Sequence, residues 1–321
     1  MQILFFTHNI FTPENPKGYR IHQYFPYLAE KGFKIDLLTT KTSFLDVLKH
    51  AGKADVVYLQ RLLLNPLKFL ALRQCAKKII YDFDDAVMYG SREKSLTREN
   101  RFRRTVKYAD AVFCGNPFLL NEAKKYRNTA AYYVPTVVDT DEYPVKIHNE
   151  HKPFVIGWMG SSSTLKYLSD IKELFLFFQN NRDVCFKFVA DKPSGMEGET
   201  ILFEKWDKNR EKSMLLDFDA GIMPARDDIW SQGKCGLKLI QYMAAGLPSI
   251  THPVGVANDI IEDGINGFLR KNTDGWKDAI EALSKDTALR NTMGKKAREN
   301  AEEKYSLKHW GPKVTEIIRN I

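Results

Sequence analysis

A glycine- and lysine-containing loop in the C-terminal half has the residue types of an anion-binding site. The loop spans Ser231–Gly236 (SQGKCG) and runs directly into a helical pattern. Gly233 and Gly236 let the backbone approach a ligand closely, and the free amides and charge of ~+0.5 at a helix start suit a phosphate. Lys234 and Lys238 stand in or beside the first turn, where the helix dipole disfavours cations unless an anion is bound. Alternatively, the segment is an exposed helix start with ordinary surface lysines.

A second loop of small residues, Gly157–Thr164, joins the first expected strand of the same half to its first helix. Gly160, Ser161 and the hydroxyls after them resemble a nucleotide-phosphate turn, but they make no complete dinucleotide or P-loop fingerprint. Lys166 lies two residues into the next helix and can point toward the same ligand. Because no Gly-x-Gly-x-x-Gly follows a strand, an NAD-dependent oxidoreductase is excluded.

Carboxylates follow an expected strand in the N-terminal half, in the sequence Asp82–Asp85 (DFDD). Such a cluster could bind Mg²⁺ or Mn²⁺, orient an acceptor hydroxyl or cap the next segment. Because the phosphate loops lie in the other half of the chain, we favour an acceptor-side or structural role and predict no metal site. His8, at the end of the first strand, is a further candidate for acceptor contact, although a lone histidine there is more often structural.

Short runs of β-branched and aromatic residues alternate with amphipathic stretches along the chain. Near-continuous apolar strands separated by helices indicate parallel sheets covered on both faces. We therefore predict an α/β protein of two doubly wound, Rossmann-like domains, with ligands at the carboxyl ends of the strands facing each other across a cleft. The expected strands are Ile3–Thr7, Ile35–Thr39, Val56–Leu59, Lys78–Tyr81, Ala111–Cys114, Ala131–Val134, Phe154–Met159, Val184–Val189, Ile201–Phe203, Ala220–Met223, Ser249–Thr251 and Gly267–Leu269.

The polar, proline-containing stretch 135–153 interrupts this alternation and is typical of a linker. We expect an N-terminal domain over residues 1–146 and a C-terminal domain over residues 152–305. A final helical segment, 306–321, is expected to pack back on the first domain. Longer helices are expected at Tyr19–Lys31, Leu165–Asn180, Lys208–Leu216 and Gly236–Ala245.

The chain contains 48 Lys and Arg residues and 40 Asp and Glu residues, a formal net charge of +8. Part of this excess lies in the segment 92–107, which could meet anionic lipid head groups, nucleic acid or an anionic acceptor, or be a solvated helix face. We favour peripheral membrane contact over nucleic acid as the functional interpretation. Four scattered cysteines, an N-terminus without a basic leader and the lack of a long apolar run predict a protein of the cytoplasm or the inner face of the membrane.

Taken together, these segments resemble the family-4 retaining glycosyltransferases of GT-B fold over nearly the whole chain. The family's donor segment commonly runs from a Glu through a short loop and Gly-Leu to a helix with a second Glu, which ends in Met-Ala-x-Gly-x-Pro. Gly236-Leu237 and Met243–Pro248 (MAAGLP) fit this segment. Further similarities are Gly255, Glu262, Gly264, Gly267 and Phe268 after it, and Val134–Asp139, Pro16–Arg20 and Glu30–Phe33 in the N-terminal half.

The chain departs from the family at the donor site. The two family glutamates fall on Gly233 and Gln241; the amide of Gln241 can still hydrogen-bond a ribose, whereas Gly233 offers no side chain. The family's basic pair on the diphosphate falls on Ser161 and Lys166. In this interpretation Lys238 or Lys234 supplies the missing charge.

The resemblance implies transfer of a hexose from a nucleoside-diphosphate sugar to a hydroxyl of a glycan or lipid-linked glycan, with retention, in polysaccharide biosynthesis. Amides and lysines aimed at the leaving diphosphate would stabilise its charge without a metal, and no cofactor is expected. The expected catalytic residues are Lys166, Lys238 and Lys234; the donor-binding residues are Gly160, Ser161, Gly233, Cys235, Gly236, Leu237 and Gln241; the acceptor-side residues are His8, Gly18, Arg20, Asp84 and Asp85. Two alternatives are a nucleotide-sugar epimerase on the same fold and a catalytically inactive GT-B-like binding subunit.

Overall fold

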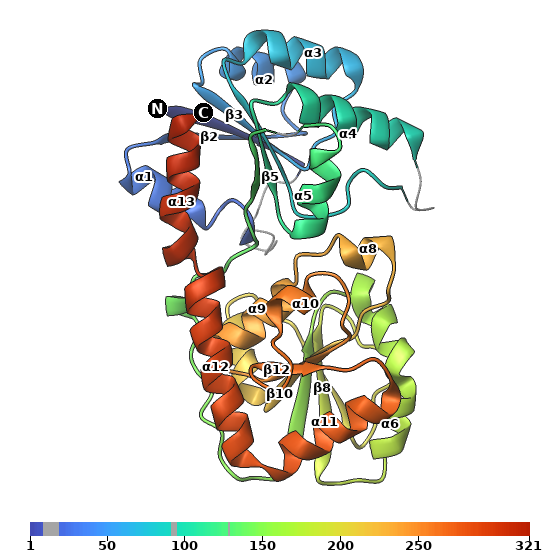
Figure 1. Ribbon diagram of the computed structural model, residues 1–321. Helices are drawn as coiled ribbons and strands as arrows, with labels where there is room; N and C mark the ends of the chain where they lie inside the picture. The colour runs from blue at the N-terminus through green and yellow to red at the C-terminus, as the bar shows by residue number, and fades with distance from the viewer. Residues whose placement is uncertain (9–18, 91–94, 128) are drawn as a thin grey trace. The chain divides into compact units, whose positions relative to one another are not determined.

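The computed structural model describes residues 1–8, 19–90, 95–127 and 129–321, and it contains two six-stranded parallel sheets (Figure 1). The chain forms two compact units. Unit 1 comprises Met1–Val137, Asp228–Cys235 and Leu307–Ile321, and unit 2 comprises Val138–Asp227 and Gly236–Ser306. Each sheet alternates with helices along the chain, so the predicted α/β class with two doubly wound sheets is confirmed.

The sheet of unit 1 has the strand order β2-β1-β3-β4-β5-β6. Its central strands are buried from end to end, which agrees with their near-continuous apolar sequences. The strands are β1 (Gln2–Thr7), β2 (Lys34–Thr39), β3 (Val56–Gln60), β4 (Ile79–Phe83), β5 (Ala111–Cys114) and β6 (Ala131–Tyr133).

Helices cover both faces of this sheet. On one face, α2 (Phe44–Ala51), α3 (Pro66–Cys75), α4 (Leu96–Tyr108) and α5 (Pro117–Lys124) pack against one apolar core. On the other, α1 (Tyr24–Glu30) and α13 (Leu307–Asn320) lie side by side (Figure 1). The side chains of Ser43, Asn65, Ser95 and Asn116 cap the first turns of α2 to α5, which explains where each helix begins.

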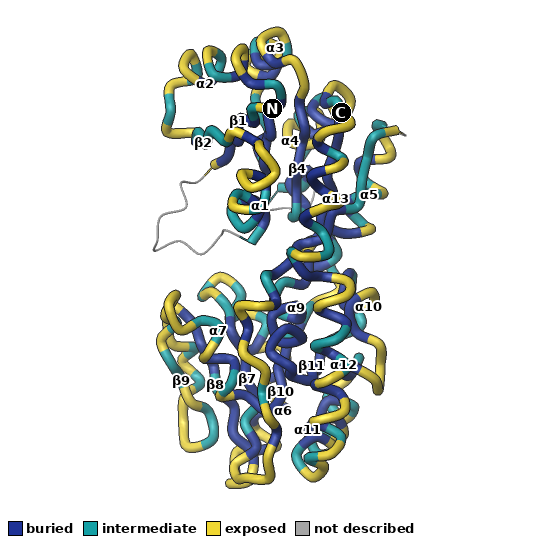
Figure 2. Tube along the Cα trace, turned by 90° about the vertical axis from the view of Figure 1, so that its left-hand side faces the viewer, coloured by how far each residue is buried: buried dark blue, intermediate teal, exposed yellow. Residues whose placement is uncertain are grey.

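The sheet of unit 2 has the order β12-β11-β10-β7-β8-β9. The order reverses between β7 and β10, and ligands of open α/β sheets bind outside the carboxyl ends of the strands at such a point. Figure 2 shows the buried core of this unit in dark blue. The strands are β7 (Phe154–Met159), β8 (Val184–Ala190), β9 (Ile201–Lys205), β10 (Ala220–Met223), β11 (Ser249–Thr251) and β12 (Gly267–Leu269).

The helical segments of unit 2 depart from the sequence prediction in two places. The helix expected over 165–180 is a 3₁₀ segment, η3 (Ser162–Ile171), followed by α6 (Lys172–Phe178). Hydroxyl side chains compete for backbone hydrogen bonds here, since Thr164 Oγ1 donates to the carbonyl of Ser161. The helix expected over 208–216 is two short turns. The remaining elements are η2 (Thr140–Glu142), α7 (Glu211–Met214), η4 (Leu215–Asp217), α9 (Leu237–Ala244), α10 (Ala257–Ile260), α11 (Thr273–Lys285) and α12 (Thr287–Tyr305).

One segment lies elsewhere than its place in the sequence suggests. Residues 228–235, which include α8 (Ile229–Gln232), belong to unit 1 by their contacts, although both flanking segments belong to unit 2. The sequence placed this segment in the C-terminal domain because it is continuous with the helix that follows. Its position is set instead by contacts with the residues after β4 and with the start of α5, both of which are distant in sequence.

Candidate active site

The start of α9 has a glycine as its N-cap residue and therefore no side-chain cap from that residue. Gly236 is the N-cap residue and has a left-handed backbone, with φ of 66°. A Cβ atom at this position would stand 2.5 Å from Cδ1 of Ile260 and 3.0 Å from Cγ1 of Val256. Glycine is therefore required both by the backbone angle and by the space. Gly236 itself has no side chain that could cap the helix, so a bound anion is one partner that the first-turn amides can accept.

Lys238 brings the two predicted phosphate loops of unit 2 together. A Cβ atom on Gly160, the residue after β7, would stand 2.7 Å from Cε of Lys238 and 2.6 Å from the Trp158 ring. The Nζ atom of Lys238 lies 5.4 Å from the centre of that ring. The lysine therefore crosses from the first turn of α9 to the loop after β7, and only glycine at 160 leaves room for it.

Lys166 lies in a second basic group at the same edge of the sheet. Its Nζ atom is 5.3 Å from the centre of the Tyr167 ring, and Cζ of Arg226 is 5.7 Å from the same ring. Arg226, in the loop after β10, also makes two 2.6 Å hydrogen bonds to Asp170. The sequence interpretation did not include Arg226, because its nearness to Tyr167 depends on the strand order and not on sequence spacing.

The start of η3 is already occupied by a carboxylate. The backbone amide and the hydroxyl of Ser162 donate to Asp191 at 2.6 and 2.8 Å. These hydrogen bonds lower the pKa of Asp191 below its usual value. Ser161 itself is exposed, and its hydroxyl lies 2.7 Å from that of Ser163. Of the two predicted loops, the start of α9 is thus the one that leaves its amides uncapped.

Gln241 is buried and has a carboxylate partner that the sequence did not reveal. Its amide nitrogen donates to Oε1 of Glu211 at 2.8 Å and to the hydroxyl of Tyr143 at 3.3 Å. Only 5% of Gln241 is exposed. The contact to a ribose that the sequence suggested would therefore require this pairing to change.

The three donor-loop residues before Gly236 belong to unit 1 and contact the segment after β4. The Lys234 Nζ atom pairs with Asp85 at 3.0 Å, and the Cys235 thiol donates to the Asp84 carbonyl at 3.2 Å. A Cβ atom on Gly233 would stand 2.5 Å from that of Ala86. Burial raises the pKa of the Cys235 thiol, which therefore stays neutral. Gly233 thus serves close packing within unit 1, which sequence spacing alone could not show.

The same segment is held by a buried amide. The Nδ2 atom of Asn116 donates to the carbonyls of Gln232 and Lys234 at 3.0 and 2.8 Å, while its Oδ1 atom accepts from the amide of Leu119 at the start of α5. Asn116 is 1% exposed. It therefore joins residues 228–235 to the first turn of α5.

The carboxylates after β4 are engaged by cations. Arg61 donates to Asp85 at 2.7 Å and lies 3.5 Å from Asp84, with a left-handed backbone at φ of 58°. Asp82 is fully buried and pairs with Arg20 at 2.5 to 3.0 Å. No group of three or more residues able to hold a metal ion occurs among the described His, Cys, Asp and Glu residues.

Arg20 and His8 occupy different environments in unit 1. Arg20 is 4% exposed and also donates to the carbonyl of Val134, so it stabilises the interior instead of reaching a ligand. His8 is exposed at the carboxyl end of β1, where partial burial and the charges of Arg61 and Arg98 lower its pKa. It is therefore neutral at pH 7. Gly18, the other predicted acceptor-side residue, lies outside the described residues.

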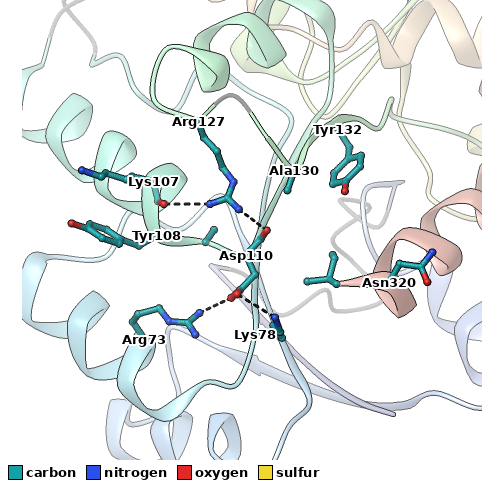
Figure 3. Close-up of a pocket in the computed structure, with 11 residues that line it drawn as sticks. Arg73, Lys78, Lys107, Tyr108, Asp110, Arg127, Ala130, Tyr132 and Asn320 are labelled. Atoms are coloured by element: carbon teal, nitrogen blue, oxygen red, sulfur yellow. Dashed lines mark hydrogen bonds and ion pairs between the residues drawn. The ribbon is translucent and has the colours of Figure 1, made fainter.

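A cavity of about 610 Å³ opens in unit 1 at the amino ends of β4, β5 and β6 (Figure 3). Its arginines have structural partners. Arg73 pairs with Asp110 at 2.6 Å, and Arg127 donates to the carbonyls of Lys107 and Asp110 at the end of α4. Because ligand sites of parallel α/β sheets lie at the opposite, carboxyl ends of the strands, we interpret this cavity as a surface hollow between helix ends.

Comparison with known proteins agrees with the geometry of unit 2. Residues 195–300, which contain α9 and the loops before and after it, match the family model for glycosyl transferases group 1. The chain contains a group 1 glycosyltransferase domain. This domain includes Lys238, Gly236 and Gln241, but not the loop at Gly160.

Two curated relatives extend the similarity beyond this group 1 domain. The chain is 26% identical to an alpha-D-kanosaminyltransferase of Streptomyces kanamyceticus over 44% of its length and 39% of the relative. It is 25% identical to a poly(ribitol-phosphate) alpha-N-acetylglucosaminyltransferase of Staphylococcus aureus (strain COL) over 68% of its length and 47% of the relative. The chain thus matches less than half the length of each.

The fold is shared over the whole chain. The solved structure of Anabaena HepE in complex with UDP and glucose superimposes with a TM-score of 0.75 at 14% identity, and all of both chains is covered. This similarity shows the GT-B fold around the group 1 domain. No helix in the described ranges is both long and apolar enough to span a bilayer.

Proposed function

We propose that this protein is a glycosyltransferase that moves a hexose from a nucleoside-diphosphate sugar to a hydroxyl acceptor. One observation carries the proposal: the uncapped start of α9 in a group 1 domain, with Lys238 lying between it and the loop at Gly160. Amides at a helix start and an adjacent ammonium group suit a pyrophosphate. Two curated relatives are named as sugar transferases, which supports the same class.

The chemistry would depend on stabilising the leaving diphosphate. As the bond between the sugar and the phosphate breaks, negative charge grows on the phosphate oxygens and the sugar becomes oxocarbenium-like. Fixed donors aimed at that charge are usually the largest catalytic contribution. We assign the first-turn amides of α9 and Lys238 to the diphosphate, with Lys166 and Arg226 as further cations. This proposal needs no metal and includes retention of configuration, with the leaving phosphate taking the acceptor proton.

The acceptor would bind to unit 1, at the carboxyl ends of its strands. His8, Asp84 and Asp85 lie at that edge and bear the polar groups that can hydrogen-bond a sugar hydroxyl. We propose a glycan or lipid-linked glycan as the acceptor. Arg61, which orients both carboxylates, joins this group although the sequence interpretation did not include it.

A non-catalytic binding subunit is the second candidate. At the two positions where the family has glutamate, this chain has Gly233, which is packed against Ala86, and Gln241, which is paired with Glu211. The absence of both glutamates favours a subunit without catalysis. Such a subunit would bind the nucleotide sugar without turnover. An epimerase, in contrast, would convert the nucleotide sugar without any acceptor.

A two-step experiment tests the proposal. A thermal-shift panel of UDP, GDP, ADP and TDP sugars identifies the donor, since a ligand that binds the native state raises the melting temperature. The selected donor is then incubated with and without a panel of glycan and lipid-linked acceptors, and free nucleoside diphosphate is measured. We expect one donor to stabilise the wild type more than Lys166→Ala, and acceptor-dependent release. Binding without release would favour the binding subunit, an epimerised donor would favour the epimerase, and no binding would contradict all three.

A further inference from the structure

The three most exposed large apolar side chains of the described residues stand at equivalent positions. Leu45, Leu67 and Leu96 are 79%, 80% and 78% exposed. Each is the first or second residue of its helix, α2, α3 or α4. Leu70, three residues after Leu67 on the same face of α3, is 56% exposed. Scattered single leucines at a surface need no explanation, but a repeated position on three consecutive helices does.

The topology gathers these leucines at one edge of unit 1. The three helices pack on the same face of a parallel sheet, and each begins after the carboxyl end of its strand. Nζ of Lys68 lies 5.2 Å from the Phe44 ring, which places the first turns of α2 and α3 together. The first turn of α4 is held at the same edge, because Arg98 donates to the carbonyl of Val87 just beyond β4.

The same helices carry most of the positive charge excess of the chain. Within their bounds α2, α3 and α4 have eight Lys or Arg residues and two Asp or Glu residues. Three of the basic residues lie in the last turns, away from the leucines, and five lie nearer to them: Lys68, Arg98, Arg101, Arg103 and Arg104. Both acids have local partners: Asp46 pairs with the Ser43 hydroxyl at 2.6 Å, and Glu99 accepts from Tyr126 at 3.2 Å. Basic side chains near an anionic lipid surface are attracted to it, and the attraction increases with their number.

We propose that the first turns of α2, α3 and α4 form a docking surface for an anionic lipid bilayer, with Leu45, Leu67, Leu70 and Leu96 entering the interface. We call these four residues the leucine rim. Apolar side chains framed by lysine and arginine are the combination that binds reversibly at the surface of a membrane. The sequence placed membrane contact in the basic segment 92–107 alone. The structure adds the apolar component and moves the centre of the surface to three helix starts.

The rim also lies at the edge of the sheet that holds His8, Asp84 and Asp85. It would bring these residues to the lipid surface, where the hydroxyl of a lipid-linked acceptor is presented. This last step rests on the proposed function. The docking surface itself does not, since binding to vesicles requires neither a nucleotide sugar nor catalysis.

Vesicle co-sedimentation tests the surface directly. The full chain is mixed with vesicles of phosphatidylcholine alone, or of phosphatidylcholine and phosphatidylglycerol in equal parts, at about 0.1 M and about 0.5 M NaCl. The test variant combines Leu45→Gln, Leu67→Gln and Leu96→Gln, because glutamine keeps the helix propensity. The matched control combines Leu176→Gln and Leu202→Gln, two leucines of unit 2 that are 57% and 49% exposed. Melting temperatures of all three proteins check that they are folded.

We expect the wild type and the control to bind the anionic vesicles at the lower salt concentration, and the triple variant to bind at least about tenfold more weakly. Binding should fall in neutral vesicles and at the higher salt concentration, since the basic residues act through screened charges. The proposal is overturned if the wild type does not bind anionic vesicles, or if the rim variant and the control bind equally. Acceptor-dependent transfer to a water-soluble glycan should be unchanged in the rim variant. A failure of this transfer would count against the proposed function and not against the docking surface.

Discussion

Gly160, the residue after β7, lies directly against Lys238 in the first turn of α9. A methyl group added to Gly160 would stand 2.7 Å from Cε of the lysine and 2.6 Å from the Trp158 ring. The glycine, the ring and the lysine therefore share one small space at the point where the strand order of unit 2 reverses. The position of the lysine ammonium group is coupled to the absence of a side chain at residue 160.

Replacing Gly160 should displace this lysine without unfolding unit 2. In Gly160→Ala the new methyl group forces the Lys238 side chain or the Trp158 ring to move. We expect affinity for the nucleoside-diphosphate sugar to fall by about tenfold or more, as for the loss of one charge-assisted hydrogen bond. Titration calorimetry measures the change. Gly198→Ala is the matched control, because a Cβ there has no described atom within 4 Å; equal affinities in both variants would refute the coupling.

Gly236→Ala separates backbone strain from lack of space at the start of α9. Gly236 and Gly264 both have left-handed backbones, with φ of 66° and 78°. Only Gly236 is crowded, by Ile260 and Val256, whereas a Cβ at 264 meets nothing in the described chain within 4 Å. We expect Gly264→Ala to cost about 1 kcal/mol of unfolding free energy and Gly236→Ala about 2–4 kcal/mol, from strain plus overpacking. Urea denaturation measures both; a cost that is the same at the two sites would show that the crowding relaxes freely.

Breaking the buried pair of Arg20 and Asp82 should strongly destabilise unit 1. Asp82→Asn leaves the Arg20 guanidinium buried without its counterion, which typically costs about 3–5 kcal/mol. The exposed pair of Lys152 and Asp183 is the comparison, and Asp183→Asn should change the unfolding free energy by less than about 1 kcal/mol. Thermal and urea unfolding of the two variants give the values. A mild effect of Asp82→Asn would mean that water reaches the arginine.

His148 should make stability depend on pH below neutrality. Its Nε2 lies 3.0 Å from the carbonyl of Gly246, and its Nδ1 is buried with no described hydrogen-bond partner. Burial lowers the pKa of His148 from the usual 6.5. The unfolded chain therefore binds more protons below pH 6.5, so this contribution to stability is present above pH 6.5 and is lost as pH falls toward the lowered pKa.

The variant His148→Gln tests this dependence, since its amide can donate to the same carbonyl but does not titrate. We expect its unfolding free energy to fall less than that of the wild type between pH 7 and pH 5. Some pH dependence remains, because burial also lowers the pKa values of His22 and His252. Parallel pH profiles for the two proteins would contradict the assignment to His148.

The strands could be predicted from the sequence because buried parallel strands are short apolar runs with turn residues on both sides. Phe154–Met159, Ala220–Met223 and Ala111–Cys114 have the predicted bounds. The helix starts were less accurate, as in the 3₁₀ segment over Ser162–Ile171, where hydroxyl side chains bind the backbone and no apolar periodicity marks the difference.

The candidate site was predictable only in its local parts. The glycine at 236 and the lysine at 238 follow from the chemistry of a helix start. Three contacts could not be predicted from the sequence: Gln241 with Glu211, Asp85 with Lys234, and Arg226 with the Tyr167 ring. Each joins residues from different loops, and their positions are decided by strand order and packing, which leave no periodic signal in the sequence.

The most direct measurement is the affinity of the protein for the nucleoside diphosphate itself. Titration calorimetry with UDP, GDP, ADP and TDP is carried out on the wild type, on Lys238→Gln and on Lys295→Gln, which alters an exposed lysine of α12. We predict that one diphosphate binds, that Lys238→Gln weakens its binding by about ten- to a hundredfold and that Lys295→Gln leaves it unchanged. Equal binding by all three proteins, or no binding by the wild type, would contradict the assignment of the α9 start as the diphosphate site.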